Sequence, residues 1–202
     1  MISAIAHELK FWKWFITTPR FLDGWVKKKK TPELNEVVYN FLKQNNGKTL
    51  DVGSGVVSLL NGTVNDLTAC DPLGELYECI FDYQKHKITP CLPFTAEELK
   101  FENEFDIVHI SNALDHSQDP KKAFENLLRA TKKYLIIQGF ENEADYENWQ
   151  GFHQWNMTLG DSLTISNKEG VKLDTKDYQL KIVLKQTINL TNKNWIIFIA
   201  EK

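Results

Sequence analysis

The pattern of apolar and polar positions predicts helices that alternate with short buried strands. Apolar residues recur at helical spacing from Leu34 to Leu42 and from Ala123 to Leu128. Four short apolar runs bounded by turn-forming or polar residues are predicted as strands, at 48–52, 67–70, 105–110 and 134–138, and a further helix is expected at 74–83. This alternation indicates a parallel sheet covered by helices on both faces.

The end of the chain has a different pattern. Residues 178–187 and 195–200 are both rich in β-forming residues, and 189–194 between them suits a turn. We therefore expect a hairpin that adds antiparallel strands to the sheet.

The first 30 residues combine aromatic side chains with four lysines, Lys27 to Lys30, and Thr31-Pro32 then reads as a helix start. The aromatic segment predicts a helix that packs on the domain or covers a ligand. We expect one domain over 1–202, with 1–30 as an N-terminal helix or lid and 31–202 as the core of the domain. The lysines suit either a phosphate contact or a solvated face.

Composition narrows the class of protein. The chain has 202 residues, 42% hydrophobic and 25% charged, with a formal net charge of −3. These values are typical of a globular protein and lack the basic excess that nucleic-acid binding needs, so a small-molecule partner is expected. Cys70, Cys79 and Cys91 show no C-x-x-C spacing, so we expect no metal site, no disulfide framework and a cytoplasmic location. The longest apolar runs are too short for membrane insertion.

Two strand ends carry the strongest chemical signal. Gly53-Ser54-Gly55 follows the first predicted strand, and Asp71 follows the second. Glycines there let a backbone approach a nucleotide, and an acid at the second strand end accepts hydrogen bonds from ribose. An ordinary tight turn and a turn-forming Asp are the structural alternatives. Asp51 suits a cationic amino-acid group better than a pyrophosphate, and Ser58 stands where a dinucleotide fingerprint has its third glycine.

Several segments, in order, resemble the class I S-adenosylmethionine-dependent methyltransferases, in particular their small-molecule branch. Asp51-x-Gly53-x-Gly55 is similar to that family's first motif, Asp71 to its ribose-binding acid, 95–101 to its segment beside adenine, and 105–108 with 112–120 to its fourth strand and next helix. The resemblance covers about residues 34 to 138. Val57 and Thr95 depart from it, at a third glycine and at the acid that meets adenine.

This resemblance implies a doubly wound α/β fold with a mostly parallel seven-stranded sheet and S-adenosylmethionine as cofactor. The residues that it places at the cofactor are Asp51, Gly53, Gly55, Asp71, Pro72, Thr95, Ala96, Glu97, Ser111 and Asn112.

His116 and His153 are the candidate catalytic residues, because imidazole exchanges protons near neutral pH. His116 follows the strand at 105–110, and His153 lies in Gly151–Asn156, whose Trp155 and Asn156 suit a polar ring-shaped acceptor. Packed loop histidines are the alternative, and a solvated carboxylate is expected for Asp115.

Gly151–Asn156 and Asp71-Pro72-Leu73 also resemble a bacterial subset associated with surface-glycan genes. That resemblance implies O-methylation of a small polar acceptor, such as a sugar or a phosphorylated metabolite. Two other functions remain open: a catalytically silent cofactor-binding partner of another methyltransferase, and a nicotinamide-dependent reductase.

Overall fold

The structure is a computed structural model that describes residues 2–18, 21–26 and 35–202. The predicted lysine run at 27–30 and the helix start at Thr31-Pro32 lie outside these residues. Contacts between residues divide the chain into two compact units, Met1–Thr95 and Ala96–Lys202. A single catalytic domain over 1–202 stays a prediction.

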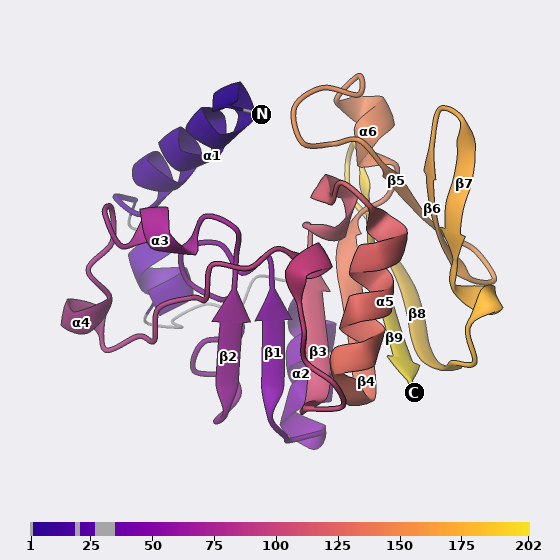
Figure 1. Cartoon of the computed structure of the whole chain (residues 1–202), viewed down its shortest axis with the longest axis horizontal. Helices are drawn as coiled ribbons and strands as arrows, with labels where there is room; N and C mark the ends of the chain where they lie inside the picture. The colour runs from indigo at the N-terminus through magenta and orange to yellow at the C-terminus, as the bar shows by residue number, and fades with distance from the viewer. Residues whose placement is uncertain (1, 19–20, 27–34) are drawn as a thin grey trace. The chain divides into compact units, whose positions relative to one another are not determined.

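The first unit contains two parallel strands and several helices (Figure 1). Its elements are α1 (Ile2–Phe15), a π-helical turn (Phe21–Val26), α2 (Glu36–Gln44), β1 (Thr49–Val52), β2 (Leu67–Cys70), α3 (Gly74–Tyr77) and α4 (Tyr83–His86). Strands β1 and β2 pair in parallel from Thr49 opposite Leu67 to Val52 opposite Cys70. Both strands lie where the hydrophobic pattern predicts them.

The helix predicted over 74–83 is wrong beyond Tyr77. Phe81 and Tyr83 are both buried in the aromatic cluster of the first unit, with ring centroids 5.0 Å apart. In a continuous helix, residues two apart point to nearly opposite sides, so they cannot enter one cluster. The chain therefore leaves the helix, and the Tyr83 hydroxyl donates to the Val56 carbonyl at 2.7 Å.

The second unit contains a four-stranded sheet and a separate three-stranded sheet. Its elements are β3 (Phe105–Ser111), α5 (Pro120–Ala130), β4 (Thr131–Phe140), α6 (Glu143–Tyr146), β5 (Asn156–Leu159), β6 (Leu163–Asn167), β7 (Gly170–Asp174), β8 (Lys181–Asn189) and β9 (Asn194–Glu201). Strand β3 pairs in parallel with β4, which pairs antiparallel with β9, and β9 pairs antiparallel with β8. The predicted C-terminal hairpin is confirmed.

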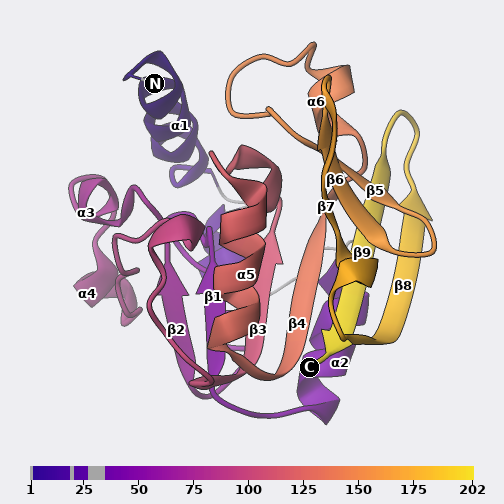
Figure 2. The same ribbon diagram turned by 45° about the vertical axis from the view of Figure 1, so that its right-hand side comes forward.

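Helix α5 begins at the capping residues Asp119 and Pro120 and contains the apolar positions that predict it. The Asp119 carboxylate accepts a hydrogen bond from the Lys122 backbone N–H at 3.0 Å, and Pro120 occupies the first turn. The helix lies against β3 and β4 (Figure 2), and its apolar residues are buried. The next strand follows without a loop, because Thr131 both ends α5 and begins β4.

The α/β class is confirmed, but the number of strands differs from seven. In the described residues the first unit has the parallel pair β1 and β2, and the second unit has four strands in the order β3-β4-β9-β8. Strands β5, β6 and β7, which the sequence did not predict, form a separate antiparallel sheet. Both edges of β4 are already paired, with β3 and β9, so the chain after β4 builds a sheet of its own.

Candidate active site

The glycine loop of the first unit has the backbone geometry that its sequence predicts. Gly53 and Gly55 adopt φ values of +67° and +65°, in the left-handed region that favours glycine. The Ser54 backbone N–H donates to the carbonyl of Cys70 at 3.1 Å, which fixes the loop against the end of β2. The loop is thus a tight turn at the carboxyl ends of two parallel strands, where ligands bind in open α/β sheets.

Helix α1 packs directly on this loop within the first unit. A Cβ atom at Gly55 would lie 2.2 Å from the ring of Trp12, so the indole occupies the space of a side chain. The indole is buried, donates its Nε1 hydrogen to Glu8 at 2.7 Å and meets the Tyr77 ring edge-on at 6.1 Å. The expected aromatic helix therefore covers Gly55.

Asp71 lies at the end of β2, but it is buried and not a solvated rim carboxylate. Its two oxygens accept hydrogen bonds from the backbone N–H groups of Gly55 at 3.0 Å and Leu73 at 2.9 Å. Burial raises the pKa of Asp71 to about 6, although these hydrogen bonds oppose the shift. Pro72 beside it is exposed. The carboxylate predicted to bind ribose therefore also joins the glycine loop to the segment after β2 by hydrogen bonds.

Asp51 is part of β1 and is buried, with 2% of its surface exposed. Its carboxylate accepts a hydrogen bond from the Ser58 hydroxyl at 2.5 Å. The same hydroxyl accepts from the Leu60 backbone N–H at 2.9 Å. Ser58, which the sequence marked only as a missing glycine, thus holds the predicted methionine-binding acid in place.

The segment predicted beside adenine spans the end of the first unit and the start of the second. Thr95 is half-buried, and Ala96 begins a short 3-10 turn. The carbonyls of Ala96 and Glu97 accept hydrogen bonds from the Asn126 amide at 3.1 and 2.8 Å. The Glu97 carboxylate accepts from the Gln118 backbone N–H at 2.7 Å, so it holds the loop before α5.

Ser111 and Asn112 connect the carboxyl ends of β3 and β4. The Ser111 hydroxyl accepts a hydrogen bond from the Gln138 amide at 3.2 Å. Asn112 has φ +50°, and its side-chain oxygen accepts from the Phe140 backbone N–H at 3.3 Å. The two parallel strands therefore end together, with polar groups on both.

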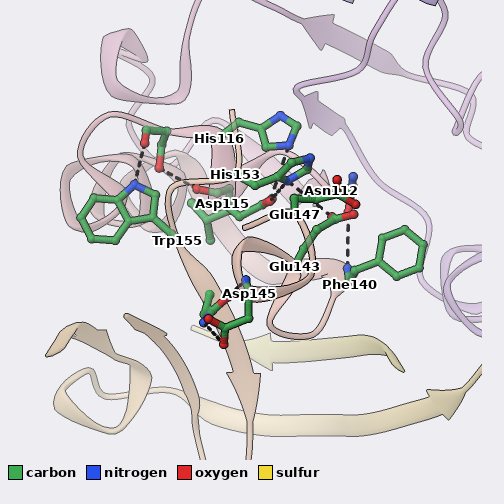
Figure 3. Close-up of polar contacts among 12 residues, drawn as sticks. Asn112, Asp115, His116, Phe140, Glu143, Asp145, Glu147, His153 and Trp155 are labelled. Atoms are coloured by element: carbon green, nitrogen blue, oxygen red, sulfur yellow. Dashed lines mark hydrogen bonds and ion pairs between the residues drawn. The ribbon is translucent and has the colours of Figure 1, made fainter. Parts of the chain in front are cut away.

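Beyond these strand ends, the two candidate catalytic histidines meet around one carboxylate (Figure 3). The Oδ2 atom of Asp115 lies 3.0 Å from His153 Nδ1 and 3.5 Å from His116 Nε2. Asp115 and His116 belong to a 3-10 turn after β3, whereas His153 belongs to the loop before β5. Asp115 is 1% exposed, so the expectation of a solvated carboxylate is wrong.

Charges around His153 favour its protonated form. Burial alone lowers the pKa of His153, but the hydrogen bond and charge of Asp115 outweigh it, and the net pKa is raised. Glu143, which the sequence did not single out, places Oε2 at 3.7 Å from His153 Nδ1. Its other oxygen lies 3.2 Å from Lys193 Nζ, so that cation offsets the Glu143 charge.

The loop that carries His153 is fixed by contacts on both sides. The Trp155 indole N–H donates to the Ser117 carbonyl at 2.8 Å, and the Phe152 ring stacks on His116 at 5.6 Å. Asn156 is buried and its amide donates to Asp145 at 2.8 Å, so the expected contact between Asn156 and an acceptor is wrong. The turn with Asp115 and His116 and the loop with His153 are thus joined by direct contacts.

Comparisons with known proteins show which family and which folds the chain resembles. Residues 50–137 match the family described as "Methyltransferase domain". No curated protein matches the chain. Similar solved structures include an S-adenosylmethionine-dependent methyltransferase from Clostridium acetobutylicum, at 15% identity and TM-score 0.59, which covers 89% of this chain and 95% of that one.

Two further structures contain a cofactor. Magnesium protoporphyrin IX methyltransferase from Synechocystis, with bound S-adenosylmethionine, has 13% identity and TM-score 0.57, and the match covers 83% and 77% of the two chains. The 1,6-didemethyltoxoflavin N1-methyltransferase of Burkholderia thailandensis, with S-adenosylhomocysteine, has 13% identity and TM-score 0.56, with 90% and 85% covered. At this identity they show a shared fold. The family match over residues 50–137 and the shared fold together support a class I methyltransferase, an enzyme that uses S-adenosylmethionine.

Proposed function

We propose that the enzyme transfers the methyl group of S-adenosylmethionine to an oxygen of a small polar acceptor, such as a sugar or sugar phosphate of surface-glycan biosynthesis, in the cytoplasm. The observation that carries this proposal is the meeting of His116 and His153 around the buried carboxylate of Asp115. A proton-accepting group is needed when the acceptor is an alcohol, because the alcohol must lose a proton. It is not needed when the acceptor atom is already nucleophilic.

The reaction needs alignment more than activation of the donor, because the sulfonium is already a good leaving group. The acceptor oxygen forms a bond to the methyl carbon as the bond from carbon to sulfur breaks, and S-adenosylhomocysteine leaves. Positioning contributes on the order of 7–11 kcal/mol to such reactions in favourable cases. His153 and His116 assist the loss of the hydroxyl proton.

The residues proposed to contact the cofactor lie at strand ends and in loops. In the first unit they are Asp51, Gly53, Gly55, Asp71, Pro72 and Thr95, and in the second unit, taken by itself, they are Ala96, Glu97, Ser111 and Asn112. Several of these groups already have internal partners, as Asp51 has in Ser58 and Glu97 in Gln118. We therefore propose that these residues bind the cofactor through backbone groups and side-chain oxygen atoms that their internal partners hold in place.

A transfer assay tests the function directly. We would incubate the chain with methyl-labelled S-adenosylmethionine and a panel of sugars and sugar phosphates, and measure cofactor binding by calorimetry. Binding of S-adenosylmethionine with label transfer to a hydroxyl supports the proposal, and no response to NAD is expected. Cofactor binding without transfer to any acceptor would favour a silent partner, whereas NAD binding alone would favour a reductase.

Replacement of Asp71 tests the ribose contact. We expect Asp71→Ala to weaken S-adenosylmethionine binding by about tenfold or more, since a charge-assisted hydrogen bond contributes roughly 1.5–3 kcal/mol. Because Asp71 also holds Gly55 and Leu73, the free energy of unfolding should fall as well. Calorimetry on the folded fraction separates the two effects. Equal affinity in Asp71→Ala and parent would exclude the ribose assignment.

Cofactor affinity should also depend on pH. The ionised Asp71 accepts ribose hydrogen bonds, and its pKa of about 6 means that it gains a proton as the pH falls through that value. Affinity should therefore be constant above about pH 7 and fall by up to about tenfold per pH unit below 6. Calorimetry from pH 5 to 8 measures this, and Asp71→Asn should bind weakly with no such slope. A parent profile as flat as that of the variant would contradict the prediction.

A further inference from the structure

The cluster of Asp115, His116 and His153 has the donor set and spacing of a transition-metal site. One carboxylate oxygen and two ring nitrogens lie within 4.8 Å of one another. Asp115 Oδ2 is 3.0 Å from His153 Nδ1 and 3.5 Å from His116 Nε2. Ligands of a tetrahedral zinc ion, with bonds near 2.1 Å, are separated by roughly 3.4 Å. Small side-chain movements would therefore bring all three atoms to one ion.

Buried polar atoms at the cluster lack hydrogen-bond partners. Asp115 Oδ1, His116 Nε2 and Glu143 Oε2 are buried and, in the part of the chain that the structure describes, accept or donate no hydrogen bond. Asp115 as a whole is 1% exposed. Because an unsatisfied buried carboxylate oxygen is costly, such atoms indicate a missing ligand.

The charge of the cluster also favours a cation. Asp115 and Glu143 are both buried acids. The Lys193 cation pairs with Glu143 and Glu147, so it offsets the charge of Glu143 and not that of Asp115. In the described residues, the groups that form ion pairs with Asp115 are the two imidazoles, which bear a charge only when protonated. A bound cation would offset the buried carboxylate while the imidazoles stay neutral, the form that binds metals.

We propose that Asp115, His116 and His153 bind one divalent first-row transition-metal ion, with zinc as the best fit. Two imidazoles and one carboxylate suit such ions, whereas magnesium and calcium prefer oxygen ligands alone. Cysteine spacing gave no hint of this site, because its ligands are one carboxylate and two imidazoles, and the fold brings His153 to Asp115 from 38 residues away.

Three protein ligands leave a fourth position open, as in catalytic zinc sites. An acceptor hydroxyl bound there would lose its proton to water more easily, since the metal would stabilise the alkoxide, so the two imidazoles would assist as ligands and would not take the proton themselves. That oxygen then bonds to the methyl carbon as the bond to sulfur breaks. This catalytic role rests on the proposed function, whereas metal binding itself does not.

The test measures metal binding without cofactor or acceptor. The full chain is stripped with a chelator and titrated with ZnCl2 by calorimetry and with CoCl2 by visible absorption. We expect one ion per chain. Each of three ligand variants should weaken metal binding by at least about 100-fold: His116→Ala, His153→Ala and the near-isosteric Asp115→Asn. Replacing a residue that only hydrogen-bonds to a metal ligand already weakens metal affinity by about 10–100-fold, so loss of a ligand should cost more. His7→Ala, which removes an exposed imidazole, is the matched control and should bind as the parent does.

Circular dichroism confirms that each variant is folded before it is titrated. Absence of stoichiometric binding in the parent, or equal affinity in the three ligand variants, would overturn the site. A chain that binds zinc with the expected dependence but methylates no hydroxyl keeps the site and removes the proposed function. Undiminished methyl transfer by the stripped enzyme, with chelator present, would overturn the catalytic role of the ion.

Discussion

His153→Ala should lower kcat by about 10²–10⁴-fold while S-adenosylmethionine binds as tightly as in the parent. The reason is that the imidazole faces Asp115 at 3.0 Å in the second unit, beyond the strand ends where the cofactor residues are expected. Its side chain is 22% exposed, so its loss leaves only a modest packing defect. Turnover per folded molecule, cofactor affinity and thermal midpoint, measured together, check the prediction.

Two variants serve as references for this result. His116→Ala removes the other imidazole at Asp115 and should also lower turnover, whereas His7→Ala should not. A variant of His153 that is less stable but fully active per folded molecule would show a packing role. Full activity in His153→Ala beside an inactive His116→Ala would move the proton-removing group to the turn after β3.

Gly55→Ala should lower the free energy of unfolding by about 2–5 kcal/mol. The left-handed backbone costs an alanine roughly 1–2 kcal/mol, and overpacking costs typically about 1–3 kcal/mol more. The second effect is expected because the new methyl group would lie 2.2 Å from the buried Trp12 ring. Urea unfolding measures the change.

Gly151→Ala is the matched control for the backbone effect. Gly151 has φ +67°, close to the +65° of Gly55, but a Cβ atom there would meet nothing within 4 Å. Its cost should therefore be the backbone strain alone, and the difference between the two variants reports the Trp12 contact. Equal destabilisation by both substitutions would mean that α1 does not pack on the glycine loop in solution.

Much of the fold follows from local sequence patterns. Strands β1 and β2 are predicted well, because each is a short apolar run that ends at turn-forming residues. Helix α5 is predicted well, because its apolar positions recur at helical spacing and Asp119 caps its start. The glycine loop and Asp71 are likewise predicted from their places after strands. These features depend on residues close together in the sequence.

The remaining features depend on contacts between distant residues. Tyr83 ends the predicted helix early by binding Val56, which is 27 residues away. Asp115 is buried because residues 38 positions later fold over it, so its local sequence looked like that of a solvated loop. Glu143 joins the cluster without any local pattern that distinguishes it from its acidic neighbours.

Strand β8 has a consequence for the behaviour of the protein at high concentration. It is the last strand of its sheet, and the register shift between Ile182 and Leu184 interrupts its pairing with β9. Ile182 and Val183 are 41% and 42% exposed. An unpaired apolar edge invites intermolecular strand addition, which irregular register and charged neighbours such as Lys181 and Lys185 oppose. Loss of these lysines should therefore favour aggregation before it affects folding.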